Sequence, residues 1–196
     1  MIDKRYFTNF PKLESTRLVY RQINSLVDSQ LIYKLRTDNQ VMKYLDNFHH
    51  KSIQESKEFI EKNLKCYLNL GCITWAIIDK DTNQSIGDFS FFNINEKHSR
   101  AEIGYSLLPG YWNKGIMTES LTTLINFGFN KFKINRLEAD VNPLNINSIL
   151  LLKKIGFIKE GYFKENYYFN GNYIDSEIYS LLGSNFNPIT IGSTKK

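Results

Sequence analysis

The chain has 196 residues, of which 42% are hydrophobic and 14% aromatic, so it is long and apolar enough to build one domain with a sizeable core. Its net charge is +5, but the basic residues are scattered, so the composition offers no polybasic arm and we expect no direct nucleic-acid partner. No apolar run reaches the roughly 18 residues of a membrane span, and the first residues lack the apolar core of a signal peptide. We therefore expect a cytoplasmic protein without a membrane partner.

The cysteines and histidines do not have the spacing of a metal or redox site. Cys66 and Cys72 do not form a C-x-x-C pair, and His49, His50 and His98 lack metal-ligand spacing. We expect both thiols to be buried and reduced, and we expect no bound metal.

The first elements in chain order are an arm, a strand and two helices. Residues 1–12 read as an arm, and Arg17–Gln22 alternates like a half-buried strand. Leu31–Leu35 marks a short helix, and Ser52–Glu55 is a capping box that opens a second one. The apolar face of this second helix is expected to consist of Ile60, Leu64, Tyr67 and Leu68. Gly71 suits the end of the helix.

The remaining elements predict a mixed α/β (α+β) domain around one sheet. They are expected as strands at 72–78, 86–92 and 100–107, a helix through 117–125, a strand at 135–141, a helix that ends at Gly156, and strands at 160–169 and 172–182. Asn170-Gly171 between the last two strands is a strong hairpin signal. This order is not the regular alternation of a doubly wound nucleotide-binding fold. We expect one domain at residues 13–183 and a frayed polar tail at 184–196.

The stretch "PGYWNKGIMTES" between the third of these strands and the next helix suggests an anion site. Gly110, Lys114 and Gly115 put a cation and bare backbone amides at the start of a helix. A Walker loop would need a lysine and a hydroxyl directly after the second glycine, where Ile116 and Met117 stand instead. No G-x-G-x-x-G spacing occurs in the turn. Two alternatives remain at this point: a metal-free pyrophosphate cradle, or an ordinary turn with a positive φ at Gly115.

Four segments, taken together in order and spacing, resemble the GNAT N-acetyltransferases and in particular the RimJ/RimL-like branch. They are "LESTRLVYRQI", "AEIGYSLLPGYWNKGIMTESL", "NRLEADVNPLNINSILLLKKIGFIKEGYF" and "NGNYIDSEIYSLL", and they span about residues 13–182. The branch acetylates N-terminal amines of ribosomal proteins and other amines. The resemblance implies the GNAT fold, which is one largely antiparallel sheet with helices on both faces.

The same resemblance implies that acetyl-coenzyme A (acetyl-CoA) binds at the turn. The implied cofactor-binding residues are Ser106, Leu107, Leu108, Trp112, Asn113, Lys114, Gly115, Ile116, Met117, Thr118 and Asn145. In the family pattern Q/R-x-x-G-x-G/A, only Gly115 matches strictly, whereas Trp112 and Met117 depart from it. Asn113 stands where the branch often has glycine, which could stiffen the loop.

The implied chemistry is direct attack of a primary amine on the thioester in a ternary complex, without a metal or a covalent intermediate. Glu160 and Glu102 match two positions that hold the general base in relatives, although each could be an ordinary surface carboxylate. Ser148 matches a proposed acid for the thiolate, or it is a plain helix-start hydroxyl. Many relatives use a tyrosine at the position of Leu152, so that role is missing here.

The acceptor and the oligomeric state are not fixed by the sequence. A protein N-terminus, a polyamine, an aminoglycoside or another small amine would fit, and dimers are common among relatives. Asp175 could meet a cationic amine, although a solvated carboxylate near the hairpin turn explains it as well. The main alternative is a non-catalytic CoA-binding module of the same fold, while the missing lysine and hydroxyl disfavour a P-loop phosphotransferase.

Overall fold

The computed structural model of this chain describes residues 1–189. Its helices are α1 (Arg5–Thr8), α2 (Ser29–Thr37), α3 (Asn39–Met42), α4 (Ile53–Leu68), α5 (Ile116–Asn130) and α6 (Ile146–Ile155), with short 3-10 turns at Pro109–Tyr111 and Gly183–Asn185. Its strands are β1 (Leu13–Glu14), β2 (Leu18–Gln22), β3 (Ile73–Asp79), β4 (Gln84–Asn95), β5 (Arg100–Leu107), β6 (Arg136–Val141), β7 (Ile158–Phe169) and β8 (Asn172–Leu182).

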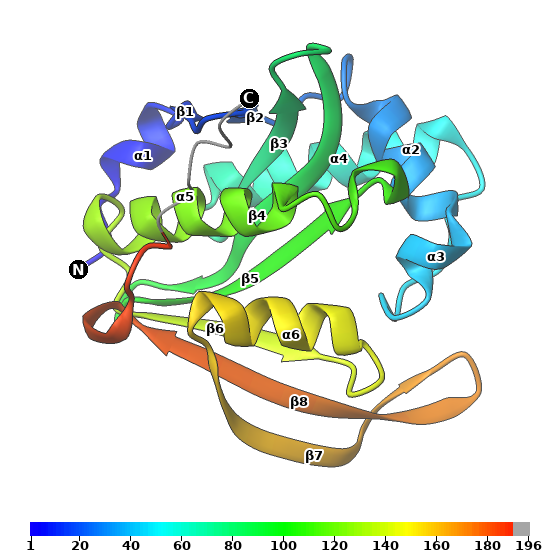
Figure 1. Cartoon of the computed structure of the whole chain (residues 1–196). Helices are drawn as coiled ribbons and strands as arrows, with labels where there is room; N and C mark the ends of the chain where they lie inside the picture. Colours follow the sequence, from blue (N-terminus) through cyan, green and yellow to red (C-terminus); the bar gives the residue numbers. More distant parts are fainter. Residues whose placement is uncertain (190–196) are drawn as a thin grey trace.

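The strands form one eight-stranded sheet in the order β1-β2-β3-β4-β5-β6-β8-β7. Every neighbouring pair is antiparallel except β5 with β6, which is parallel. Figure 1 shows α5 and α6 in front of the sheet and α4 behind it. The expected fold, a largely antiparallel sheet with helices on both faces, is confirmed.

Two apolar clusters hold the helices to the sheet, because successive side chains of a strand point to opposite faces. The larger cluster joins the sheet to α5 and α6 and includes the fully buried Trp75 and Phe89. The smaller cluster lies under α2 and α4, where Ile32, Leu35 and Ile60 meet. The strand β5 therefore presents alternate side chains to two different helical layers.

The helix α4 shows both a confirmed and a wrong local expectation. The Ser52 side chain accepts a hydrogen bond from the backbone N–H of Glu55, as the capping box predicts. Leu68, however, is 73% exposed and not part of the buried face. The left-handed residue after the helix is Leu70, with φ of 61°, and not Gly71. The packing of the chain overrides the local preference for glycine there.

The two end segments pack on the core of the described chain. Ile2 and Phe7 are buried among its apolar residues, so the expected arm is held in place. Phe186 packs against Phe129 with 5.4 Å between the ring centroids, so the expected fraying does not begin at residue 184. Residues 190–196 lie outside the described residues, and the domain boundaries stay a prediction.

The parallel pair of β5 and β6 creates the opening in which a site can form. Their register covers only residues 100–102 and 136–138, after which the two strands diverge. The loop that leads into α5 and the start of α6 both lie beside this opening (Figure 1). Within residues 1–189, no helix combines the length and apolar character needed to cross a membrane.

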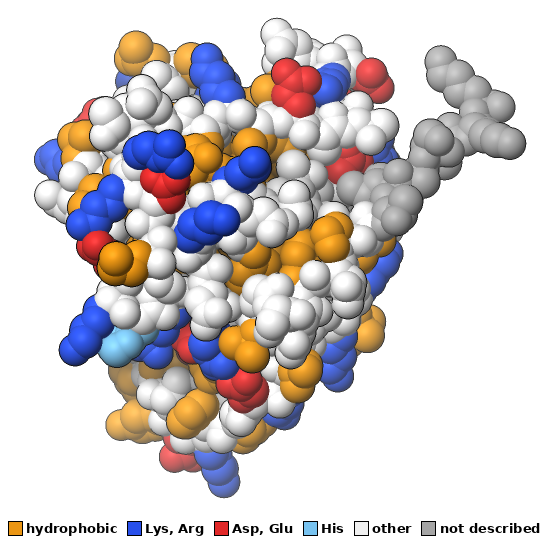
Figure 2. Space-filling view, turned by 90° about the vertical axis from the view of Figure 1, so that its left-hand side faces the viewer, with side chains coloured by type: hydrophobic (Ala, Val, Ile, Leu, Met, Phe, Trp, Pro, Cys, Tyr) orange, Lys and Arg blue, Asp and Glu red, His pale blue; other side chains and the backbone are white. Residues whose placement is uncertain are grey.

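The surface charge matches the scattered pattern of the sequence. Figure 2 shows lysine and arginine side chains spread over one face among acidic, polar and apolar ones.

Candidate active site

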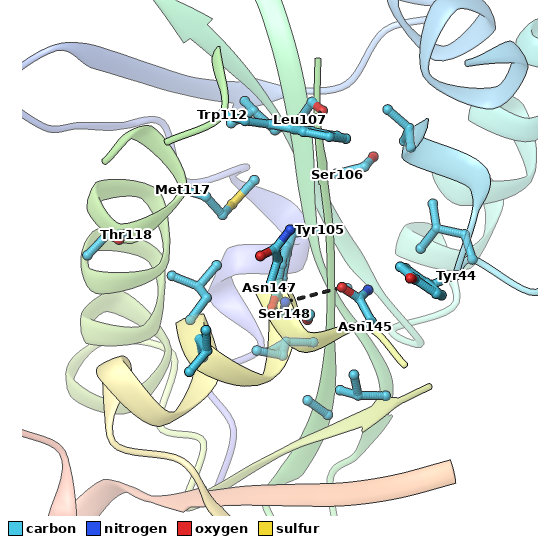
Figure 3. A pocket seen from close by; sticks show the side chains of 18 of the residues that line it. Tyr44, Tyr105, Ser106, Leu107, Trp112, Met117, Thr118, Asn145, Asn147 and Ser148 are labelled. Atoms are coloured by element: carbon cyan, nitrogen blue, oxygen red, sulfur yellow. Dashed lines mark hydrogen bonds between the residues drawn. The ribbon is translucent and has the colours of Figure 1, made fainter. Parts of the chain in front are cut away.

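A cavity of about 760 Å³ occupies the opening between β5 and β6. Its walls come from residues 103–107 of β5, residues 139–142 at the end of β6, and residues 115–118 at the start of α5. The first turns of α6, and residues 40, 41 and 43–45 in and after α3, complete them. Figure 3 shows Met117 and Thr118 on the α5 side, Tyr44 on the opposite side, and Tyr105 and Ser148 between them. A volume of this size is ordinary for a site that holds an organic molecule.

The loop before α5 and the uncapped start of that helix line the cavity. Gly115 is the N-cap residue of α5, with φ of 72°, and no side chain caps this helix. The first amides of an α-helix have no partner within the helix and carry its positive pole. Asn113 also has a left-handed φ, of 58°, a conformation that asparagine tolerates better than most residues. It therefore takes a backbone conformation that suits glycine.

Three hydrogen bonds fix the path of this loop. The indole Nε1 of Trp112 donates to the carbonyl oxygen of Leu107 at 2.7 Å, which pins the loop to the end of β5. The Arg17 guanidinium donates to the carbonyl oxygen of Lys114 at 2.9 Å and to Glu119 Oε2 at 2.7 Å. A Cβ atom added at Gly115 would lie 3.5 Å from the Arg17 Nη2 atom, so a fixed cation stands beside the turn.

Glu119 anchors this arrangement from inside the protein. Its side chain is fully buried and accepts hydrogen bonds from Ser15 Oγ at 2.7 Å and from the Arg17 backbone at 2.8 Å, besides the guanidinium. Burial acts to raise the pKa of Glu119, but these hydrogen bonds and the Arg17 charge outweigh it, so the pKa lies below its usual value. The carboxylate therefore stays ionised at neutral pH.

Replacing Glu119 with glutamine is expected to destabilise the fold by about 2 kcal/mol, or a fall in Tm of about 4–8 °C at pH 7. A lowered pKa in the folded state adds stability above the unfolded value of about 4.3, and this is lost as the pH falls through the folded value. The Tm difference between wild type and Glu119→Gln should therefore shrink below pH 4. Calorimetric melting at several pH values measures it, with the exposed Glu61→Gln as control; a difference that grows in acid would contradict the assignment.

The start of α6 brings a serine and a tyrosine together in the cavity. The Asn145 side chain accepts a hydrogen bond from the Ser148 backbone N–H at 3.2 Å and so caps the helix. The Ser148 hydroxyl is hydrogen-bonded to the Tyr105 hydroxyl at 2.7 Å. Burial raises the pKa of Tyr105 to about 12. No motif in the sequence marks Tyr105 as the partner of Ser148, because the two residues lie 43 positions apart.

On the other face of β5, Ser106 meets a buried carboxyl group. The Ser106 hydroxyl donates to Asp88 Oδ1, and both residues are less than 10% exposed. Ser106 lines the cavity, and Figure 3 shows its hydroxyl directed toward the segment that carries Tyr44. No sequence motif marks Asp88, because its position opposite Ser106 depends on the register of β4 with β5.

The two glutamates expected as general bases do not line the cavity. The Glu160 carboxylate forms a two-point ion pair with Arg136, at 2.6 and 3.1 Å, and the Arg136 hydrogen bond lowers the pKa of Glu160 to about 2. Glu102 lies where β5 and β6 still pair, and its Oε1 accepts from Asn93 Nδ2 at 2.9 Å. Neither carboxylate contacts the cavity. The catalytic roles of Glu160 and Glu102 therefore stay predictions.

Most of the residues expected at the cofactor do line the cavity. They are Ser106, Leu107, Trp112, Asn113, Gly115, Ile116, Met117, Thr118 and Asn145, together with Ser148. Leu108 instead packs against the apolar cluster under α2 and α4. Lys114 places its ammonium group over the Tyr111 ring, 5.6 Å from the centroid. Asp175 accepts hydrogen bonds from Tyr162 and from the backbone of Glu165, which fits its alternative as a carboxylate of the hairpin.

Residues 17–158 match the acetyltransferase (GNAT) domain family. This chain belongs to that family. The chain is 34% identical over 173 residues to the uncharacterized N-acetyltransferase YoaA of Bacillus subtilis, which covers 88% of this chain and 97% of that protein. The expectation of an acetyltransferase enzyme is therefore confirmed.

Solved structures place the fold in the same group. The Salmonella typhimurium acetyltransferase that modifies the N-terminal serine of ribosomal protein L7/L12 is 25% identical, with a TM-score of 0.78 over 86% of this chain and 96% of that one. The spermidine N-acetyltransferase of Vibrio cholerae, solved with CoA and spermine, is 22% identical, with a TM-score of 0.77 over 87% and 98%. At 22% identity this second likeness establishes the fold alone. The expected likeness to the RimL-type acetyltransferases is confirmed.

Proposed function

We propose that this protein transfers the acetyl group of acetyl-CoA to a primary amine by direct attack in a ternary complex. The observation that carries the proposal is the continuous cavity that joins the uncapped start of α5 to the opening between β5 and β6. One end offers amides and a helix pole for an anion, and the other end offers hydroxyl groups between two diverging strands. A long molecule with a pyrophosphate and a thioester fits both ends.

The residues of the loop are suited to the pyrophosphate of the donor. Gly115 has no side chain to cover the amides at the start of α5, and the Arg17 guanidinium stands nearby. Asn145 and residues 103–107 would lie along the arm that ends in the thioester. No step of this scheme requires a metal; within residues 1–189, no cluster of three potential metal ligands occurs.

The hydroxyl pair of Ser148 and Tyr105 is suited to the leaving thiolate. The two hydroxyl oxygens lie 2.7 Å apart. One hydroxyl can therefore give a proton to the thiolate while the other stabilises it by a hydrogen bond. This contact supports Ser148 as the acid and Tyr105 as its hydrogen-bonded partner. Many relatives use a tyrosine as the acid at the position of Leu152, and in this chain the Tyr105 hydroxyl would assist that same protonation of the thiolate.

The acceptor is proposed as a primary amine on a peptide N-terminus or a small molecule. The names of the two solved relatives cover both cases, an N-terminal serine and spermidine. A cytoplasmic location, which was expected from the sequence, and a homodimer, which was expected from the family likeness, remain parts of the proposal.

The first experiment is a calorimetric titration with acetyl-CoA in the absence of metal, beside a titration with ATP and Mg²⁺. Binding of acetyl-CoA but not of ATP supports acetyl-CoA as the donor. Binding of ATP but not of acetyl-CoA would favour a P-loop phosphotransferase. A thiol-release assay with serine-initiated peptides, spermidine and an aminoglycoside then separates an enzyme from a non-catalytic CoA-binding module. Tight CoA binding without thiol release from any amine would favour the module.

A further inference from the structure

The side chains of β5 divide the opening into two chemical sides. Tyr105 faces α6 and contacts Ser148, whereas Ser106, the next residue, faces the opposite layer and contacts Asp88. The alternation of a strand makes this division obligatory. The next residue on the Ser106 side, Leu108, packs under α2 and α4, which confirms the direction.

The Ser106 side of the opening is walled by the segment in and after α3. Gln40 and Tyr44 line the same cavity as Ser106 (Figure 3). Glu102, four residues before Ser106 on β5, is about 13 Å away along the strand at about 3.3 Å per residue. Gly104 between them is covered by the Phe92 ring, which an added Cβ would meet at 3.1 Å. Unlike Glu102 and Glu160, Asp88 is hydrogen-bonded to a hydroxyl group that lines the cavity.

Few charged groups face Asp88 from the elements packed on it. Arg36 of α2 acts on it as a cation, and Asp28, just before α2, acts as an anion. Asp28 is itself paired with Arg21 of β2 at 2.7 Å. Ala76 is its neighbour on β3, and Ser106 is its neighbour on β5. Asp88 is therefore buried with few charges around it, and its hydrogen-bond donor Ser106 is the residue that lines the cavity.

We propose that the acceptor amine enters on the Ser106 side, that Ser106 Oγ takes a proton from it, and that Asp88 accepts the proton that Ser106 gives up. This inference rests on the proposed acetyl transfer and names its proton acceptor. Ser106 contacts the reacting nitrogen, and Asp88 is a positioning residue that acts through Ser106. The thiolate would leave on the opposite side, where Ser148 and Tyr105 stand.

The protons and electron pairs balance in this scheme. The acceptor arrives as an ammonium ion, and one of its protons passes to Ser106 Oγ while the Ser106 hydroxyl proton passes to Asp88 Oδ1. The lone pair of the neutral amine then forms the C–N bond, and the C–S bond breaks with its pair on sulfur. The nitrogen loses a second proton as the amide forms, and the thiolate takes up one proton to become the thiol. Asp88 returns its proton to water after product release.

The surroundings of Asp88 raise the pKa of its carboxyl group, which makes it a better proton acceptor than an ordinary aspartate. Burial raises the pKa of Asp88, Arg36 and the Ser106 hydrogen bond lower it in part, and Asp28 raises it further, so the pKa lies above its usual value. A general base is most effective when its pKa lies near the working pH. The Arg136-paired Glu160, with its pKa of about 2, lacks this property.

The test measures kcat/KM for the amine that gives the fastest thiol release, between pH 5 and 9, in three variants. Asp88→Asn keeps the shape of the side chain and an oxygen that can accept from Ser106, Ser106→Ala removes the relay, and Ser106→Thr keeps the hydroxyl. Ser90→Ala is the matched control, because Ser90 lies on the same face of the sheet, bonded to Thr74 and away from the cavity. Melting temperature and acetyl-CoA affinity are measured for each variant.

We expect Asp88→Asn and Ser106→Ala each to lower kcat/KM at least tenfold and to remove the acidic limb of the wild-type pH profile. Ser106→Thr should recover most of the rate, and acetyl-CoA affinity should change by less than about twofold in Asp88→Asn and in the Ser90→Ala control. A folded Asp88→Asn or Ser106→Ala protein that keeps the wild-type rate and acidic limb overturns the proposal while leaving the acetyl transfer intact. Wild-type protein that releases no thiol with any amine overturns the proposed function, and this inference falls with it.

Discussion

Replacing Gly115 with glutamate is expected to weaken acetyl-CoA binding by at least about a hundredfold, as measured by titration calorimetry. In the free protein a side chain at position 115 lets the turn relax from its φ of 72°, and returning the turn to that left-handed conformation for the donor costs about 1–2 kcal/mol. The new carboxylate would also stand at the start of α5 and neutralise the field of the helix pole and of Arg17. Each loss of about 1.4 kcal/mol is tenfold in affinity, so the two effects together reach a hundredfold.

Two further variants separate the causes in this experiment. Gly115→Ala adds the strain without the charge and should weaken binding by about tenfold. Gly171→Glu is the matched control, because Gly171 has φ of 86° in the β7–β8 turn and a Cβ there would meet nothing within 4 Å. It should melt at a lower temperature but bind acetyl-CoA as the wild type does. Unchanged affinity in folded Gly115→Glu would show that the pyrophosphate does not lie at this loop.

The local conformations of this fold could be predicted because their causes lie within a few residues. Asn170-Gly171 gives the hairpin turn, with φ of 47° and 86°, and Gly156 ends α6 with φ of 109°. Gly115 takes the positive φ that the turn requires. In each case a small residue, or asparagine, adopts a conformation that other residues avoid.

The contacts that build the candidate site could not be predicted in this way. Arg17 and Glu119 are separated by 102 residues, and Tyr105 and Ser148 by 43. Asp88 meets Ser106 only because β4 and β5 pair in one particular register, and a shift of one strand by one residue would put the two side chains on opposite faces of the sheet. Family likeness led to the serine and the loop, but it could not reveal partners that lie on other strands.

The same limit explains why the sequence pointed to Glu160 and Glu102 as the base. Glu160 matches a family position in sequence, yet Arg136 lies within reach at the start of β6 and holds it as an ion pair on a 46% exposed side chain. Whether a carboxylate has a free path to a cavity depends on such neighbours, which a motif does not contain. A buried carboxyl beside a hydroxyl in the cavity is a physical signature of the kind expected at a functional site.

The division of β5 into two sides gives the reaction a direction. A proton leaves the nitrogen on the side of α2 and α3, and a proton reaches the sulfur on the side of α6. The two hydroxyl groups that serve these steps, Ser106 and Ser148, lie on opposite faces of one strand layer. The two transfers can therefore be impaired separately, and variants on one side should leave the pH dependence of the other intact.

Removing the Ser148 and Tyr105 hydroxyls is expected to lower kcat about a hundredfold, with KM for acetyl-CoA nearly unchanged. Ser148→Ala and Tyr105→Phe share one hydrogen bond of 2.7 Å, so the double variant should be at most about twofold slower than the slower single variant. Thiol release under saturating donor and amine measures kcat. The acidic limb that we assign to Asp88 should persist in these variants, because the proton-accepting side is untouched.

Tyr179→Phe is the matched control for this last experiment, since its hydroxyl is also buried but donates to Glu177 on β8, away from the cavity. It should lower the melting temperature without changing kcat beyond about twofold, because the hydrogen bond it loses contributes to folding only. Fully additive losses in Ser148→Ala and Tyr105→Phe would mean that the two hydroxyls act independently, and unchanged kcat in both would remove them from the leaving-group side. The sulfur would then take its proton directly from water, and the role of the α6 start would reduce to capping by Asn145 and to holding the donor.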